Sequence, residues 1–137
     1  MKCGITNPNI TKLSDNQIFV FGSNMGGRHG AGAARAAMSW GAVYGQGVGL
    51  QGKTYAIPTL DAMIQHQLSI HQIKNQVDSF VQFAKNNPHL HFLVTEIGCG
   101  LAGFTHSEIA PLFVECLSMS NVSLPLSFVK LLGGINQ

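Results

Sequence analysis

The sequence has few charged residues. Asp, Glu, Lys and Arg make up 10% of its 137 residues, and the formal net charge is only +2. No stretch concentrates Lys or Arg, so the charge pattern does not indicate direct nucleic-acid binding. The three cysteines are an odd number without metal-type spacing, and no acidic or cysteine partners converge on His66, His71, His89 or His91. We therefore expect reduced thiols, no disulfide, no metal and no cofactor.

Long apolar runs are also missing. The N-terminus, MKCGITNPNI, lacks the apolar centre of a signal peptide, and no later run approaches the roughly 18 apolar residues that cross a bilayer. Internal repeats and low-complexity tails are absent as well. These absences favour a cytoplasmic protein without membrane contact, and the length favours one domain over residues 1–137.

Short apolar runs alternate with amphipathic stretches, a pattern that predicts α/β layering. Pro125, inside the last apolar run, suggests an edge strand or a late start. The expected strands cover residues 18–21, 55–59, 91–97 and 122–132.

Helices are expected at 32–40, at 70–86 and after Thr105. The middle helix has Ser69 and Gln72 as a capping box, and Asn87-Pro88 ends it. Thr105 and Glu108 repeat the capping box, and apolar residues at helical spacing continue to Leu117.

Residues 47–54 spell the pattern of a nucleotide-binding P-loop, Gly47 followed by four residues and then Gly-Lys-Thr. A P-loop requires a helix directly after the Lys-Thr, where helical amides face the phosphates. Here the residues that follow, 55–58, favour a strand, and Pro58 would interrupt a helix. We interpret these glycines as part of an irregular connection over 41–52, and a nucleoside triphosphatase is the least favoured function.

Two glycine-rich loops each follow an expected strand and precede an expected helix, at residues 22–34 and 98–108. Glycine permits backbone conformations and close approaches that side chains block, so such loops can present amides to an anion. Together they could hold a diphosphate. Either loop alone reads equally well as a structural turn.

The segments IFVFGSN, RHGAGAARAAMSWGAVYGQG, YAIPT, the helix at 70–86 and VTEIGCGLAGFTHSEIAPLF resemble the macro domain family in order and spacing. The branch that the sequence is most similar to includes ADP-ribosyl glycohydrolases acting on protein carboxylates or DNA bases. The resemblance covers residues 18–117. It implies a three-layer α/β/α fold with a mixed central sheet and an ADP-ribose cleft at the carboxyl ends of the strands.

The resemblance also implies where the ligand lies. Residues 30–33 would line one side of the diphosphate and distal ribose, residues 98–103 would cover the other, and Asn24 would face a ribose, although it equally reads as a turn residue. The family's adenine-contacting acid has no clear counterpart except Asp15. The implied ligand-binding residues are Gly22, Ser23, Asn24, Arg28, Gly30, Ala31, Gly32, Ala33, Thr59, Gly98, Cys99, Gly100, Leu101, Ala102, Gly103 and Phe104.

The sequence departs from this branch where catalysis is concerned. A Lys commonly follows the Pro-Thr of the strand and an acid often occupies the second glycine loop, but here Leu60 and Ala102 or Gly103 stand at those places. These side chains cannot transfer a proton. The remaining catalytic candidates are Asn24, His29 and Asp61, with Cys99 or Glu96 as further reactive groups.

Each candidate has a plainer interpretation: His29 as a solvated loop residue, Cys99 as a small buried one, and Glu96 as an outward carboxylate. Three functions stay open: a reader of ADP-ribose or an ADP-ribosylated macromolecule, a glycohydrolase with an altered catalytic set, and a macro-fold protein-contact module without a small ligand, for example in a phage, bacterial or mobile-element setting.

Overall fold

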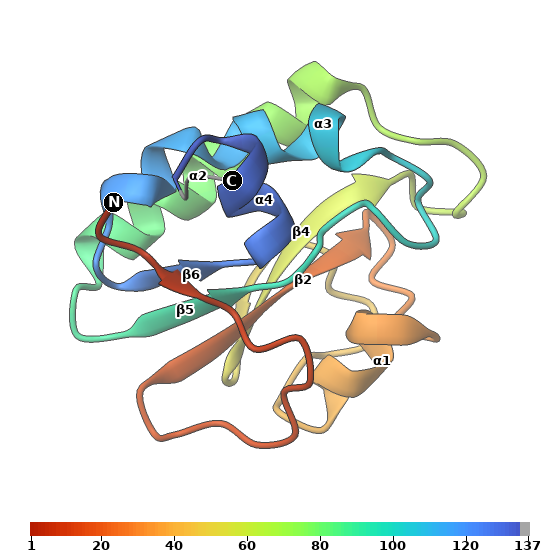
Figure 1. Ribbon diagram of the computed structural model, residues 1–137. Helices are drawn as coiled ribbons and strands as arrows, with labels where there is room; N and C mark the ends of the chain where they lie inside the picture. The colour runs from red at the N-terminus through yellow and green to blue at the C-terminus, as the bar shows by residue number, and fades with distance from the viewer. Residues whose placement is uncertain (135–137) are drawn as a thin grey trace.

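The computed structural model describes residues 1–134 and contains a six-stranded mixed sheet (Figure 1). Its strand order is β1-β6-β5-β2-β4-β3, in which β3 runs antiparallel to β4 and all other pairs are parallel. This confirms the predicted α/β class with a mixed sheet. The strands are β1 (Gly4–Ile5), β2 (Gln17–Asn24), β3 (Gly49–Gln51), β4 (Thr54–Leu60), β5 (His91–Val94) and β6 (Val122–Leu124).

Helices cover both faces of the sheet, which gives three layers (Figure 1). One face carries α1 (Gly32–Met38), and the other carries α2 (Ile70–Asn86), α3 (His106–Ile109), the 3-10 helix η1 (Ala110–Ser118) and α4 (Leu126–Leu131). The apolar run of β2 serves both layers because successive side chains point to opposite faces. Ile18 and Val20 belong to the core under α2, whereas Phe19 and Phe21 belong to the core under α1.

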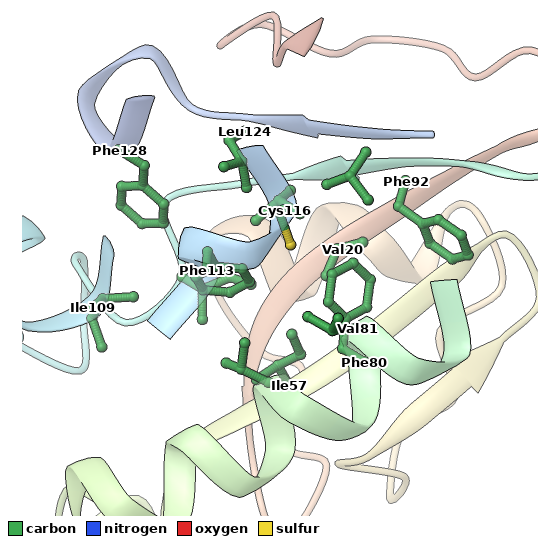
Figure 2. Packing of buried hydrophobic residues seen from close by; sticks show 14 of the residues in the cluster. Val20, Ile57, Phe80, Val81, Phe92, Ile109, Phe113, Cys116, Leu124 and Phe128 are labelled. Carbon is green, nitrogen blue, oxygen red and sulfur yellow. The ribbon is translucent and has the colours of Figure 1, made fainter. Parts of the chain in front are cut away.

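The two cores differ in size. The larger one contains fully buried phenylalanines from α2, β5, η1 and α4, among them Phe80 and Phe92 with ring centroids 5.5 Å apart (Figure 2). The smaller core packs Ala34 and Ala37 of α1 against β2. These small side chains bring α1 close to the sheet. Trp40 lies just past the helix and packs on Phe19, with the two ring centroids 5.0 Å apart.

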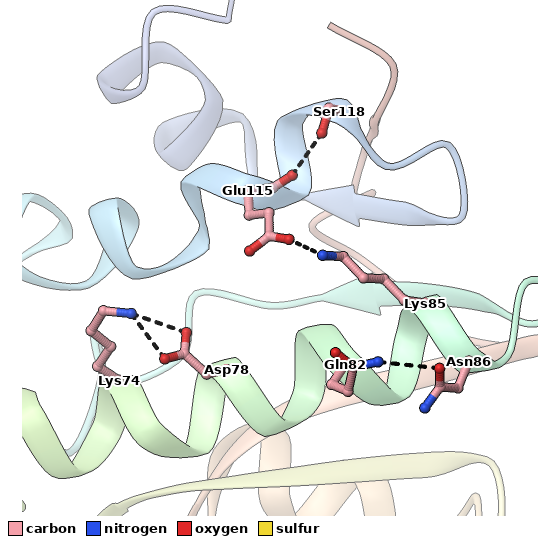
Figure 3. Close-up of polar contacts among 7 residues, drawn as sticks. All are labelled: Lys74, Asp78, Gln82, Lys85, Asn86, Glu115 and Ser118. Carbon is pink, nitrogen blue, oxygen red and sulfur yellow. Dashed lines mark hydrogen bonds and ion pairs between the residues drawn. The ribbon is translucent and has the colours of Figure 1, made fainter.

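Helix α2 has the predicted bounds and the predicted capping box between Ser69 and Gln72. Its buried face consists of Ile73, Val77, Phe80, Val81 and Ala84. On its exposed side Lys74 pairs with Asp78, and Lys85 pairs with Glu115 of η1 (Figure 3). No helix within residues 1–134 combines the length and the apolar character needed to cross a membrane.

The expected strand at 122–132 is wrong beyond Leu124. Pro125 ends the pairing because it has no backbone N–H, and its φ of −55° leads directly into α4. The edge position suggested by Pro125 is also wrong, since β6 lies between β1 and β5. Strand β5 is likewise shorter than expected. The backbone N–H and the hydroxyl of Thr95 still donate to the carbonyl of Val20, but the chain turns directly afterwards, where the amide of Ile97 bonds to the carbonyl of Thr95 at 2.8 Å.

Three further boundaries differ from the sequence-based expectations. Helix α1 stops at Met38, two residues early. The helix after Thr105 has one α-helical turn with the predicted capping box and then continues as η1, where Pro111 lacks the N–H needed for α-helical bonding. The connection over 41–52 is not wholly irregular, because it contains β3.

Candidate functional site

The parallel strands β2, β4 and β5 end at the same edge of the sheet, and a cavity of about 300 Å³ lies there. We call it the first cavity. Strand β2 contributes Gly22, Ser23 and Asn24 to its wall, and β4 contributes Thr59 and Leu60. Residues 25–31, the first loop, and residues 98–104, the second loop, follow β2 and β5 and bring their lining residues to the same cavity. Carboxyl ends of parallel strands are where open α/β sheets bind ligands.

Most of the sequence-predicted ligand residues meet at this cavity. Cys99, Gly103 and Phe104 do not line it; Phe104 is 7% exposed and packs in the larger core. The predicted residues in its wall are Gly22, Ser23, Asn24, Arg28, Gly30, Ala31, Gly32, Ala33, Thr59, Gly98, Gly100, Leu101 and Ala102.

Bare main chain forms much of the wall. A Cβ atom added to Gly30, Gly32 or Gly100 would meet no heavy atom within 4 Å, so the space beside these glycines is open. At Gly22 the opposite holds, because a Cβ there would lie 3.3 Å from the backbone nitrogen of Gly98. The absence of a side chain at Gly22 therefore lets the second loop come close to the end of β2.

Several amides of the second loop have no internal acceptor. Its turn is closed by the amide of Gly103 bonding to the carbonyl of Gly100 at 3.0 Å, and by Phe104 bonding to Gly98 at 2.9 Å. Within residues 1–134, no backbone hydrogen bond uses the amides of Gly98, Gly100, Leu101 or Ala102 as donors. Donors of this kind beside a cavity suit an anionic ligand.

Asn24 closes the first loop. Its side-chain Nδ2 donates to the carbonyl of Arg28 at 3.1 Å, and its Oδ1 accepts from the amide of Arg28 at 2.9 Å. The residue lines the cavity but is 5% exposed. Both polar atoms of its side-chain amide thus bond to the backbone of Arg28, so the structure supports the interpretation of Asn24 as a turn residue.

His29 is 1% exposed, and the interpretation as a solvated loop residue is wrong. The ring lies in the smaller core with its centroid 5.3 Å from that of Phe21, and its Nε2 bonds to the carbonyl of Gln46 at 2.9 Å. Its Nδ1 has no hydrogen-bond partner in the described part of the chain. His29 does not line the first cavity.

Asp61 does not line the first cavity either. Its Oδ1 accepts the amide of Gln65 at 2.8 Å, and this hydrogen bond, opposed in part by burial, lowers the pKa of the carboxyl group. The turn made in this way puts Ile64 on the cavity wall with a φ of 60°. A β-branched residue rarely adopts that conformation, and nothing in the sequence signalled it.

Two ionisable side chains line the first cavity among residues 1–134, Arg28 and Glu96. Arg28 is exposed, and its Nη2 lies 3.4 Å from the sulfur of Met63. Cys99 beside the cavity is no ready nucleophile, because burial and the nearby carboxylates of Glu96 and Glu108 raise the pKa of its thiol to about 11.

A second cavity of about 670 Å³ adjoins the first. The two share Gly32, Ala33, Thr95 and Glu96 in their walls. Its other wall residues come from the N-terminal segment 5–11, from Phe19, Ala36 and Val94, and from residues 125–127. No motif in the sequence indicated this N-terminal wall. Asp15, the candidate for an adenine contact, is exposed just before β2 and lines neither cavity.

The segment that spells a P-loop has a different structure. Gly52, with a φ of 57°, makes the turn between β3 and β4, and Thr54 begins a strand instead of a helix. The Nζ of Lys53 donates to the carbonyl of Leu13 at 3.3 Å. Gly47 is buried behind the end of β2, where its carbonyl accepts the hydroxyl of Ser23. The backbone amides that a P-loop needs for phosphate are therefore not assembled.

No group of three or more His, Cys, Asp or Glu residues within 1–134 is arranged to hold a metal ion. Comparison of the chain with models of known families, with curated proteins and with solved structures gave no match.

Proposed function

We propose that the protein binds ADP-ribose or a related nucleotide derivative, with the diphosphate between the two glycine loops. The observation that carries this proposal is the open main chain at Gly30, Gly32 and Gly100, which comes from separate parts of the sequence and borders one cavity. Only the backbone approaches the ligand at these positions. The amide of Gly30 already donates to the carbonyl of Arg28, whereas those of Gly32 and Gly100 donate no backbone hydrogen bond within residues 1–134. Free amides of this kind favour the charged, oxygen-rich centre of a dinucleotide-like molecule.

The charged and polar groups of the first cavity agree with that ligand. The guanidinium group of Arg28 can pair with a phosphate, since within residues 1–134 its one side-chain hydrogen bond is to the sulfur of Met63. The amides of Gly100 and Leu101 offer donors on the opposite side. An anion between the two loops would thus meet hydrogen-bond donors from both of them.

The second cavity supports a ligand larger than a phosphate. It continues from the first through Thr95 and Glu96, and its wall includes Phe19, Pro125 and Leu126. Apolar walls with a few polar groups suit a nucleoside base and its sugar. We place the adenosine end of the ligand in the second cavity and the distal ribose near the end of β4.

Binding without hydrolysis fits the wall better than catalysis. Leu60 and Ala102 line the first cavity at the places of the missing Lys and acid, and neither transfers a proton. The guanidinium group of Arg28 donates hydrogen bonds but has no acceptor atom, so it does not serve as a base. Glu96 is thus the one lining side chain among residues 1–134 that can act as a base, but it lies at the boundary with the second cavity, away from the end of β4 where we place the distal ribose. An ADP-ribosylated protein should therefore persist after incubation.

Calorimetric titration with ADP-ribose, ADP and inorganic phosphate tests the proposal. We expect ADP-ribose to bind most tightly and phosphate most weakly. Replacing Gly100 by Leu fills open space beside the cavity and should weaken ADP-ribose binding by roughly tenfold or more, as expected for blocking a well-fitted ligand. Ser120→Leu, an exposed change just before β6 at the other edge of the sheet, is the control.

Absence of heat, together with an unchanged melting temperature at millimolar ADP-ribose, would overturn the proposal. Equal affinity of wild type and Gly100→Leu would show that the ligand binds elsewhere.

A further inference from the structure

Glu96 stands where the two cavities meet. It follows the end of β5 by two residues and lines both cavities, as does its neighbour Thr95. A ligand that extends from one cavity into the other must pass these two residues. In the proposed binding mode, the part of the ligand at this boundary is the ribose between the diphosphate and the base.

The carboxylate of Glu96 is held from one side. Its Oε2 accepts the hydroxyl of Ser127 in α4 at 3.0 Å and also contacts the Nε2 of His106 in α3. Its Oε1 takes part in no hydrogen bond in the part of the chain that the structure describes. Glu96 therefore presents a positioned oxygen with free acceptor capacity, and the side chain is 52% exposed.

The second cavity offers a phosphate no counter-charge. Among residues 1–134, Glu96 is the only charged residue in its wall. A carboxylate accepts hydrogen bonds from neighbouring hydroxyl groups, but it repels a phosphate attached to the same sugar unless a cation stands nearby. The electrostatics of this boundary thus distinguish a free ribose diol from a phosphorylated one.

We propose that Glu96 is a specificity-determining residue that accepts hydrogen bonds from the vicinal hydroxyls of the adenosine ribose and excludes ligands with a 2′-phosphate. This inference rests on the proposed function, since it places the diphosphate at the glycine loops. Ser127 and His106 are positioning residues that hold the carboxylate.

The test compares the affinities of ADP-ribose and ADP-ribose 2′-phosphate for the full chain by calorimetry. For wild type we expect ADP-ribose 2′-phosphate to bind roughly tenfold more weakly than ADP-ribose, or weaker still, because it loses a charge-assisted hydrogen bond to Glu96 and is repelled by the carboxylate. In Glu96→Gln, ADP-ribose should lose affinity while the 2′-phosphate gains, so the ratio of the two dissociation constants should approach one.

Glu108→Gln is the matched control. It removes one negative charge near the second loop and lines neither cavity, and Gln preserves the capping box with Thr105. Its ratio of dissociation constants should equal that of wild type.

The outcomes separate the two proposals. Failure of wild type to bind ADP-ribose overturns the proposed function itself. Binding of both ligands with equal affinity leaves that function standing and overturns the role of Glu96. Equal weakening of both ligands by Glu96→Gln shows a purely structural residue and overturns it too, because a structural role does not change the ratio.

Discussion

The two glycine loops border the same cavity but are held in place differently. The first loop depends on residues distant in sequence. The carbonyl of Gln46 accepts the ring Nε2 of His29, the amide of Gly45 bonds to the carbonyl of Gly27 at 2.9 Å, and Ser23 just before the loop bonds to Gly47. Residues 43–47 thus pack against the first loop and support it through backbone contacts.

The second loop is held mainly by its own residues and those just after it. Two backbone hydrogen bonds between residues close in sequence hold the turn, and Phe104 anchors it in the larger core. The capping box of Thr105 and Glu108 begins α3 directly afterwards. A side chain from the connection after β4 also reaches it, since the Nε2 of Gln67 donates to the carbonyl of Ala102 at 2.7 Å.

This difference predicts that the two loops tolerate substitution differently. Packing of backbone against backbone leaves no room for a new side chain, whereas a loop anchored by one aromatic ring depends on that ring. Substitutions in the first loop should therefore destabilise the protein most at its buried glycines. In the second loop they should do so most at Phe104, its apolar anchor.

Gly27→Val is expected to have the largest effect. Gly27 has a φ of 65°, and a Cβ there would lie 2.2 Å from the backbone nitrogen of Gln46. The strain of a β-branched residue and the clash with backbone together should lower the free energy of unfolding by about 5 kcal/mol or more. Urea denaturation measures this loss.

Gly30→Ala is the control for that change, because its Cβ would enter open space in the same loop. It should alter stability by no more than about 0.5 kcal/mol. Similar losses for the two variants would mean that residues 43–47 do not support the first loop.

Phe104→Ala tests the anchor of the second loop and should have the next largest effect. Phe104 is 7% exposed and packs with Ile97 and Ile109 in the larger core. Removing its ring should cost about 3–4 kcal/mol in the free energy of unfolding. Leu101→Ala, in the same loop but 80% exposed, should cost about 0.5 kcal/mol or less. Equal costs at the two positions would contradict local anchoring.

The second loop was the more predictable from sequence, and for the same reason. Its capping box, its glycines and the apolar residues Phe104 and Ile109 on either side of the capping box lie within a dozen residues, so their mutual positions follow from local geometry. Helix α2 was predicted with correct bounds on the same grounds. The sequence also indicated that β2 and β5 deliver their loops to one edge of the sheet.

What escaped prediction depends on contacts distant along the chain. The burial of His29 follows from the fold of residues 43–47 over the first loop, and the second cavity requires the N-terminal segment beside Pro125. The switch from strand to helix at Pro125 was missed because apolar residues on both sides read as one run. Ile64 reaches the cavity wall through a strained turn without a sequence signature.

The smallest effect is expected where the second loop does depend on a distant residue. Gln67→Ala removes the donor to the carbonyl of Ala102 and leaves the remaining anchors intact. Because Gln67 is exposed, the free energy of unfolding should fall by only about 0.5–1 kcal/mol. Amide hydrogen exchange should nevertheless quicken at Cys99, Gly103 and Phe104, whose amides are hydrogen-bonded within the loop, since local opening becomes easier there than in the core.

Gln65→Ala is the matched control in the same connection, because its hydrogen bond to Asp61 uses the backbone amide and survives the change. Its exchange at the amides of Cys99, Gly103 and Phe104 should match wild type. If Gln67→Ala also exchanges like wild type, the second loop is held by its local contacts alone, and the contrast with the first loop is sharper than the contact to Ala102 implies. If exchange quickens instead, the hydrogen bond from Gln67, in the connection after β4, helps to order the second loop. The affinity for ADP-ribose should then fall by a factor similar to the increase in the exchange rate.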